Sequence, residues 1–333
     1  MHSIKKITIL EFAPCADALY SIKQDPAEGY LLADDESVTF RAGAVIRPHS
    51  RGTNAGGKAT NVARVIDKLL EEDEAGVELI VFRADSPEGR YIHDLQINEL
   101  RRVEVRPVVV EATGRFCINL SDPSNVRERV EFNISPHPLW KESSVDKALD
   151  AAKQISTDIL LLAGHPPLVE PELHPAGDLP ASVIRSIAGA PAITLDTSKS
   201  ALAKCLSGLR QPDLVKVNSE EFASVSRDIW ASFKGILVIT DSGGCNLHCE
   251  GPDGPPIRIK APLLERVYST VGAGDATHAG LVLALWVRGY DPERAARFGM
   301  AVAAATVSSP NSTRGITREA VQHFFEMLDD KAG

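Results

Sequence analysis

Short apolar runs alternate with helix-length segments along most of this chain. The runs are rich in Ile, Leu and Val, and they cover residues 7–10, 78–82, 158–163, 192–195, 213–217 and 235–240. Near-continuous apolar strands separated by helices are typical of a parallel sheet that is covered on both faces. The sequence therefore predicts an α/β fold with a doubly wound, mainly parallel sheet flanked by helices.

Polar residues or glycine directly follow four of these runs. They are Gly164 with His165, residues 196–198, Asn218, and Asp241 with Ser242. Any one of these could be ordinary turn chemistry, because Gly, Asp, Asn and Ser all favour turns. Ligands of open α/β sheets bind at the carboxyl ends of the strands, so four such ends together favour a binding site at this edge.

A different pattern covers residues 17–50 and 103–136. Short β segments with partial alternation follow one another there, and no helix-length segment separates each pair. We expect the two excursions to form a small antiparallel sheet, as a lid over the binding edge, as a dimerisation sheet, or as both. With this lid, residues 1–333 would form a single domain, and an exposed lid is compatible with a homodimer through sheet pairing.

Charge and cysteine usage narrow the classes of partner. The net charge is −9, and no long basic run occurs, which argues against nucleic acid and anionic membranes as partners. The five cysteines are scattered and odd in number, so we expect reduced thiols rather than a disulfide framework. No apolar run reaches the length of a membrane span. These features predict a cytoplasmic protein that binds small molecules.

Two glycine-containing turns each lead into a helix-like pattern. The first is "AGGKATNVAR" at residues 55–64, and the second is "STVGAGDATHAG" at residues 269–280. The second helix is apolar almost all round, so it should be buried, and its amino end would offer an anion site. Asp275 stands in its first turn. A base beside an anion site is what phosphoryl transfer to a hydroxyl requires.

These motifs resemble the PfkB/ribokinase-like family of carbohydrate kinases, most closely its 1-phosphofructokinase and tagatose-6-phosphate kinase branch. "GGKATNVARVI" resembles the amino-terminal signature, and "STVGAGD" with "HAG" beyond it resembles the carboxyl-terminal one. "LVKVNSEEF", "LDTSKSAL" and "EFAPCAD" resemble three further segments. The likeness spans about residues 4–315, and it implies a ribokinase-like sheet with a β lid and a role in carbohydrate metabolism.

The resemblance also implies roles for individual residues. The catalytic group would be Asp275 as base with an anion hole from Gly272, Ala273 and Gly274. The sugar would meet Asp17, Gly56, Gly57, Lys58, Asn61 and Arg115. The nucleotide would meet Lys216, Asn218, Thr240, Ser242 and Gly243. The implied cofactors are ATP and Mg²⁺, with Glu221 and Asn218 organising the metal and its waters.

The choice of substrate stays open at this point. Lys58, Arg115 and the "EFAPCAD" opening favour a sugar phosphate as phosphoryl acceptor. Residues 164–167 read "GHPP" where the phosphosugar branch carries a serine-rich turn, so an unphosphorylated sugar or a nucleoside is the alternative. A third hypothesis is a non-catalytic ligand sensor on a kinase scaffold, because a fold does not fix a function.

Overall fold

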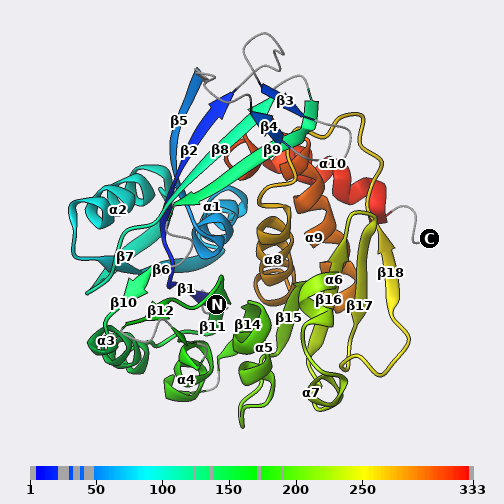
Figure 1. Ribbon diagram of the computed structural model, residues 1–333. Coiled ribbons are helices and arrows are strands. Elements are labelled where there is room, and N and C mark those ends of the chain that lie inside the picture. The colour runs from blue at the N-terminus through cyan, green and yellow to red at the C-terminus, as the bar shows by residue number, and fades with distance from the viewer. Residues whose placement is uncertain are drawn as a thin grey trace.

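A nine-stranded sheet runs through the molecule (Figure 1). The computed structural model describes residues 5–21, 30–32, 38–40, 49–122, 125–134, 138–170, 174–176, 178–189 and 191–329. In spatial order the strands are β7 (Val103–Val110), β6 (Ala75–Ala84), β1 (Lys5–Glu11), β11 (Ile159–Ala163), β14 (Ala192–Asp196), β15 (Leu214–Asn218), β16 (Ile236–Asp241), β17 (Gly244–His248) and β18 (Ile257–Lys260). Neighbours from β7 to β16 are parallel, whereas β17 and β18 add two antiparallel strands at one edge.

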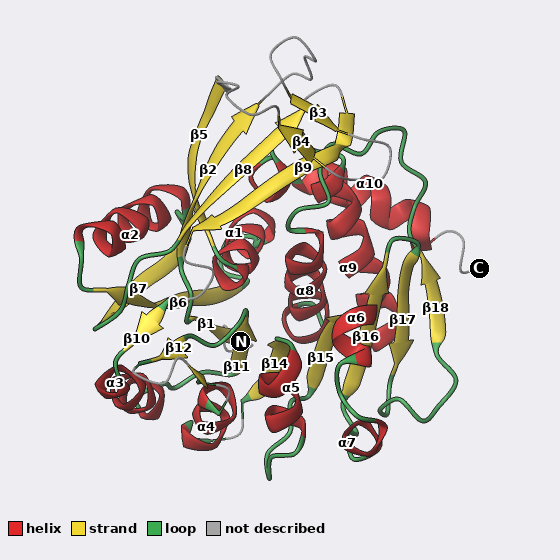
Figure 2. Cartoon of the chain, in the orientation of Figure 1, coloured by secondary structure: helices red, strands yellow, loops and turns green. Residues whose placement is uncertain are grey.

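Helices cover both faces of this sheet (Figure 2). One face packs against α1 (Lys58–Leu69), α8 (Ala273–Val282) with the π-helical turn Leu283–Val287, α9 (Pro292–Val307) and α10 (Arg318–Asp329). The other face packs against α3 (Glu142–Lys153), α4 (Leu179–Ser186), α5 (Lys199–Leu206), α6 (Ser219–Ala223) and α7 (Arg227–Ala231). The remaining helix, α2 (Pro87–Glu99), connects β6 to β7. The predicted doubly wound α/β class is therefore confirmed.

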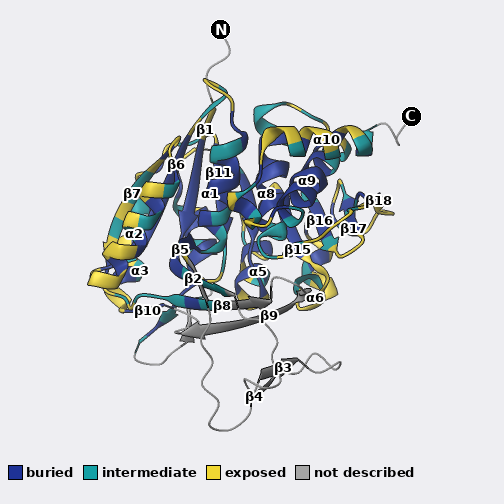
Figure 3. Cartoon of the chain, turned by 90° about the horizontal axis from the view of Figure 1, so that it is seen from above, coloured by how far each residue is buried: buried dark blue, intermediate teal, exposed yellow. Residues whose placement is uncertain are grey.

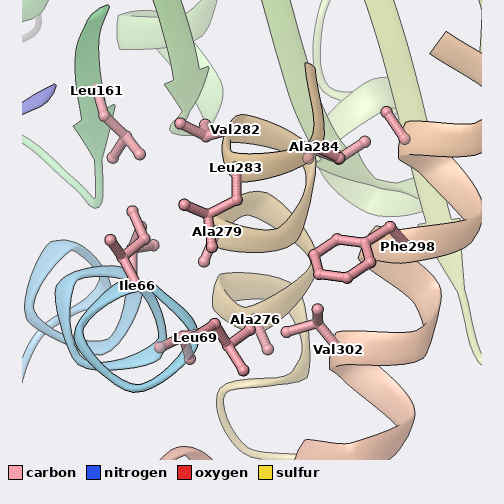
Figure 4. Packing of buried hydrophobic residues seen from close by; sticks show 14 of the residues in the cluster. Ile66, Leu69, Leu161, Ala276, Ala279, Val282, Leu283, Ala284, Phe298 and Val302 are labelled. Carbon is pink, nitrogen blue, oxygen red and sulfur yellow. The ribbon is translucent and has the colours of Figure 1, made fainter. Parts of the chain in front are cut away.

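Side chains of the central strands alternate between two hydrophobic clusters. In β11, Ile159 and Leu161 belong to the α1 and α8 side, whereas Leu160 and Leu162 belong to the α3 and α5 side. Figure 3 shows these strands as buried, and Figure 4 shows Leu161 facing the packed side chains of α1 and α8. Burial on both faces explains why the apolar runs of the sequence are nearly continuous. All six predicted runs lie on strands of this sheet.

The second sheet contains four strands in the order β5 (His49–Gly56), β2 (Cys15–Ser21), β8 (Phe116–Asp122) and β9 (Asn125–Ile134). The pair β2 and β8 is parallel, so the expectation of a purely antiparallel sheet is wrong at that pair. A separate ribbon pairs β3 (Tyr30–Leu32) with β4 (Val38–Phe40). Parts of the predicted lid, at 22–29, 33–37, 41–48, 123–124 and 135–137, lie outside the described residues. The single domain and the lid's role stay predictions.

Residues 103–110 do not belong to the second sheet, contrary to the prediction. They form β7, which pairs in parallel with β6 along its whole length, because α2 returns the chain to that edge of the main sheet. An edge strand is half exposed, so its alternating pattern matches that of a lid strand. Pro107 fits there because an edge strand leaves one row of donors unpaired.

Three smaller features complete the architecture. A three-stranded sheet joins β10 (Leu139–Trp140), β12 (Leu168–Val169) and β13 (His174–Pro175), and a 3-10 turn spans Ser312–Arg314. All five cysteines are present as thiols rather than as disulfides, as predicted. Within the described ranges, no helix combines the length and the apolar character that crossing a membrane requires.

Candidate active site

The amino end of α8 carries the candidate base. Gly272 is its N-cap and has a φ of 76°, in the left-handed region that favours glycine. A methyl group there would lie 2.7 Å from Thr313 Cγ2, so the turn has no room for a side chain. Asp275 follows in the first helical turn and is 7% exposed. The predicted buried helix with a carboxylate at its amino end is therefore present.

Asp275 has one hydrogen-bond donor from the neighbouring helix. Asn61 Nδ2 of α1 donates to Asp275 Oδ2 over 2.8 Å. Burial raises the pKa of Asp275 to about 6, against the opposing effect of the Lys58 ammonium. A carboxylate with this pKa is largely ionised at neutral pH and still able to take a proton, which suits a general base.

Asn61 is itself held from behind by a buried arginine that the sequence did not single out. Arg64 Nη1 donates to Asn61 Oδ1 over 2.6 Å, and Arg64 Nη2 pairs with Glu99 Oε2 over 2.7 Å. Arg64 also donates to the backbone carbonyl of Ala55. Because a guanidinium only donates, the oxygen of the Asn61 amide must face Arg64 and its NH₂ must face Asp275.

A row of alternating charges lies beside Asp275. Asp196, at the end of β14, is fully buried and accepts from Lys58 Nζ at 2.8 Å and from Lys216 Nζ at 2.7 Å. Lys58 also contacts Glu221 Oε1 at 3.2 Å. Burial opposes ionisation of Asp196, but the two ammonium groups hold its pKa far below the usual range. The same carboxylates, with Asp275, raise the pKa of Lys58 despite its burial.

Lys216 reaches the helix that carries the candidate base. A methyl group on Gly274 would lie 2.7 Å from Lys216 Nζ, so glycine at this position makes room for the ammonium. Lys216 comes from β15 and Lys58 from the start of α1. Two cations thus gather where the amino end of α8 already favours negative charge.

Asn218 and Glu221, predicted to organise the metal, form a capping box at the start of α6. The Glu221 amide donates to Asn218 Oδ1 over 2.8 Å, and the Asn218 amide donates to Glu221 Oε2 over 2.9 Å. Their separation by three positions is the sequence signature of such a box, which the sequence analysis did not use. Their oxygen atoms are of the hard type that Mg²⁺ prefers.

The predicted nucleotide residues extend along the next strand end. Thr240 pairs with Asn218 in the register of β15 and β16, and its hydroxyl donates to Val217 O over 3.2 Å. Ser242 and Gly243 lie exposed in the turn between β16 and β17, where Gly243 N donates to Asp241 Oδ1 over 2.7 Å. This turn lies at the same edge of the sheet as Asn218 and Lys216.

The predicted sugar residues meet where the second sheet joins α1. Gly57, the N-cap of α1, has a φ of 107°, and a methyl group there would lie 2.4 Å from Glu11 Oε2. A methyl group on Gly56 would lie 2.3 Å from Asp17 Oδ2 and 2.6 Å from Cys15 Sγ. At both positions a side chain would therefore collide with a carboxylate of the protein itself, whether or not a ligand is bound.

Glu11 is a further buried carboxyl that the sequence analysis did not single out. It is 1% exposed, and it accepts from the amide of Thr60 at 2.8 Å and from its hydroxyl at 3.1 Å. Glu11 thus caps the amino end of α1, whose own N-cap is Gly57 and has no side chain. Burial raises the pKa of Glu11 to about 7. No sequence pattern predicts this cap, because Glu11 lies on β1 and the helix that it caps is α1.

The atypical loop after β11 is fixed by the neighbouring strand end. Gly164 has a φ of 103°, and its carbonyl accepts from Thr197 Oγ1 over 2.8 Å. His165 Nδ1 and Ser198 Oγ lie 3.1 Å apart. A methyl group on Gly164 would contact Lys58 Cβ at 3.7 Å, so the loop borders the charge row. The four strand ends noted in the sequence are gathered at this edge.

Comparison with known proteins decides the family. The pfkB family carbohydrate kinase profile matches residues 25–233 and 254–318. The chain belongs to the PfkB family of carbohydrate kinases. It is accordingly a carbohydrate kinase, as predicted. Kinases of this family use ATP, typically with a divalent metal.

Solved structures of several kinases share the fold over nearly the whole chain. Phosphofructokinase-2 from Escherichia coli, in complex with substrates and products, is 21% identical with a TM-score of 0.76, covering 98% of this chain and 100% of that one. A possible 1-phosphofructokinase from Thermotoga maritima is 17% identical with a TM-score of 0.72, covering 96% and 97%. A nucleoside kinase from Methanocaldococcus jannaschii, described as an archaeal member of the ribokinase family, is 19% identical with a TM-score of 0.61, covering 97% and 99%. No curated protein matches the sequence.

Proposed function

We propose that this PfkB kinase transfers the γ-phosphoryl group of ATP to a hydroxyl of a sugar phosphate, as a 1-phosphofructokinase does, with Asp275 as the base. The observation that carries the proposal is the Asp275 carboxylate: it is buried, oriented by Asn61 and placed at the amino end of α8. The signature "STVGAGD" and the phosphofructokinases among the similar structures support the same reaction.

Each residue would have a defined task in this transfer. Asp275 accepts the proton of the acceptor hydroxyl as its oxygen forms a bond to the γ-phosphorus, and the bond from that phosphorus to the ADP oxygen breaks. The proton later leaves Asp275 for solvent. Lys216 and Lys58 would stabilise the negative charge of the phosphates. The Ala273 amide already donates to Thr270 O over 3.2 Å, so the anion hole would draw on the amides of Gly272 and Gly274.

The metal would be held at the start of α6. Glu221 and Asn218 offer carboxylate and amide oxygens there, which fit Mg²⁺ and its waters. When bound, Mg²⁺ neutralises charge on the nucleotide phosphates. Thr240, Ser242 and Gly243 would lie along the nucleotide, at the edge of the sheet beside Asn218.

A phosphorylated acceptor is favoured by Arg115, which stands directly before β8 at the sugar end of the site. Asp17, Gly56, Gly57 and Asn61 would line the same end. An arginine offers a fixed charge and paired donors, which suit a phosphate group.

An unphosphorylated sugar or a nucleoside is the second candidate. The observation in its favour is that Lys58 is already paired with Asp196 and Glu221, which leaves less of its charge for a sugar phosphate.

A substrate panel tests the proposal directly. ADP formation would be measured with ATP and Mg²⁺ against fructose 1-phosphate, fructose 6-phosphate, tagatose 6-phosphate, fructose, ribose and adenosine. We expect the highest kcat/KM with a ketose phosphate. A preference for an unphosphorylated compound would support the second candidate, and turnover with none of them would contradict both. A homodimer through the second sheet stays a prediction, which sedimentation would test.

A further inference from the structure

Strands β2, β5 and β8 lie side by side (Figure 1). Three side chains with metal-ligand chemistry meet where these strands begin or end. Cys15 Sγ, Cys117 Sγ and a carboxylate oxygen of Asp17 all lie within 4.8 Å of one another. Cys15 Sγ is 3.3 Å from Asp17 Oδ1. Both thiols are 2% exposed. Among the residues that the structure describes, this is the one group of its kind.

We propose that Cys15, Asp17 and Cys117 bind a thiophilic divalent cation of the Zn²⁺ type. A tetrahedral zinc site has Zn–S bonds of about 2.3 Å and Zn–O bonds of about 2.0 Å, so its sulfur and oxygen ligands lie about 3.5 Å apart. The separation of Cys15 and Asp17 is already close to that value. Three protein ligands leave a fourth position for water or another small ligand.

The strands bring the three ligands together without rearrangement of the backbone. Asp17 is paired with Cys117 in the parallel register of β2 and β8. Cys15 precedes Asp17 by two residues, so both side chains leave the same face of β2. Gly56 of β5 pairs with Cys15, and any side chain there would enter the group.

The charges of the group balance once the ion is bound. The ion displaces the two thiol protons to solvent, and no electron is transferred. Two thiolates and one carboxylate then carry three negative charges, of which the ion compensates two. Arg115 interacts electrostatically with both cysteines and with Asp17, and it compensates the third. A buried metal site without net charge avoids the cost of an isolated buried charge.

The site has a consequence for catalysis that rests on the proposed function. Asp17 is the residue proposed to meet the sugar, so an ion bound to its carboxylate would remove that contact. The kinase should therefore be inhibited by Zn²⁺ in competition with the sugar and not with ATP. Mg²⁺ would not replace Zn²⁺ here, because thiolates select soft cations.

Metal binding is tested on the whole chain without any substrate, so its outcome does not depend on the proposed reaction. Metal-free protein is titrated with Zn²⁺ against a chromophoric chelator, and with Cd²⁺ while the cadmium–thiolate absorption is recorded. We expect one high-affinity ion per chain. Cys15→Ser and Cys117→Ser should each weaken binding by about 100-fold, since even outer partners of a ligand are worth 10–100-fold.

Two other cysteines provide matched controls. Cys245→Ser changes a buried thiol and Cys249→Ser an exposed one, and neither should alter the affinity. Wild-type affinity in the Cys15 and Cys117 variants, or no thiolate band with Cd²⁺, would overturn the site. Should the variants fail to fold, X-ray absorption of zinc-loaded wild-type protein decides: two sulfur ligands support the site, and a shell without sulfur overturns it. Inhibition that is not competitive with the sugar would overturn the link to catalysis.

Discussion

The side-chain amide of Asn61 donates a hydrogen bond to Asp275, and the oxygen of the same amide accepts one from Arg64. The contact joins the two glycine-led helices, α1 and α8, at the atom where the proposed reaction takes up a proton. Asn61 and Arg64 come from the first two turns of α1, and Asp275 comes from the first turn of α8. Arg64 is held in turn by Glu99 of α2.

Replacing Asp275 by asparagine should abolish most of the turnover while leaving the fold intact. General base catalysis contributes about 10²–10⁴-fold, so kcat for the sugar should fall by that range. ADP release measures the loss, and Asp291→Asn, at the N-cap of α9, is the matched control. In the wild type, activity should fall as pH decreases through about 6, because protonation of Asp275 removes the base. Near wild-type turnover in Asp275→Asn would refute its role.

Removing the Asn61 amide should shift that acid limb to higher pH. The hydrogen bond favours ionised Asp275, so its loss in Asn61→Ala raises the pKa of Asp275 further. Arg64→Lys should shift the limb in the same direction, because a lysine cannot hold both Asn61 and Glu99 in a fork. The pH profile of kcat measures both, with Asn98→Ala on α2 as control. An unmoved profile in both variants would show that Asn61 and Arg64 serve packing alone.

Changing Glu11 to glutamine should remove a pH dependence of stability. Folding raises the pKa of Glu11 from 4.5 to about 7, so the folded state favours the protonated form. The stabilisation is complete below about pH 4.5 and is lost as pH rises through 7, by about 3 kcal/mol in total. Urea unfolding between about pH 5 and about pH 8 measures it. The control is Glu104→Gln, which changes an exposed residue of β7 and should leave the dependence of the unfolding free energy on pH as in the wild type. The same wild-type dependence in Glu11→Gln would show that Glu11 is ionised throughout this pH range.

Breaking the charge row should be costly for stability as well as for activity. Lys216→Met leaves the fully buried Asp196 with Lys58 as its one remaining ammonium partner in the row, and loss of a partner from a buried ion pair costs about 3–5 kcal/mol. The exposed pair of Lys204 and Asp178 is the control, because Lys204→Met should cost about 1 kcal/mol at most. Denaturant midpoints compare the two. An equally small loss of stability in Lys216→Met and Lys204→Met would mean that Asp196 is solvated or protonated.

Arg115→Ala should separate the two candidate substrate classes. If the acceptor is phosphorylated, loss of the guanidinium raises KM for it by about tenfold or more, while KM for ATP changes little. For an unphosphorylated acceptor, both KM values should stay near those of the wild type. Arg90→Ala, which removes an exposed arginine of α2, controls for a general change of charge. Steady-state kinetics with each acceptor of the panel provide the comparison.

The sequence predicted the parts of this molecule in which local pattern and burial agree. The apolar runs of β1, β11 and β14 identified strands that are covered on both faces. The prediction that residues 103–110 belong to the second sheet was wrong. An edge strand and a lid strand are both half exposed, so both show the same alternation of apolar and polar residues.

Contacts between elements distant in the chain explain what the site prediction missed. Asp275 was visible because its glycine turn and its helix are contiguous. Glu11 caps α1 from another element, and Arg64 meets Glu99 across 35 positions, so no spacing rule connects them. The pairing of Asp17 with Cys117 depends in the same way on the register of β2 and β8.

Asp196 binds Lys58 through Oδ1 and Lys216 through Oδ2, and the two lysines are proposed to meet the sugar and the nucleotide, respectively. One carboxylate is thus the common counter-ion of both lysines. A phosphate that draws either ammonium away must weaken or strengthen the hold on the other. By thermodynamic linkage, the effect of the sugar on ATP affinity then equals the effect of ATP on sugar affinity. The two substrates of this kinase should consequently change each other's affinity by the same factor, through a residue that neither of them needs to touch.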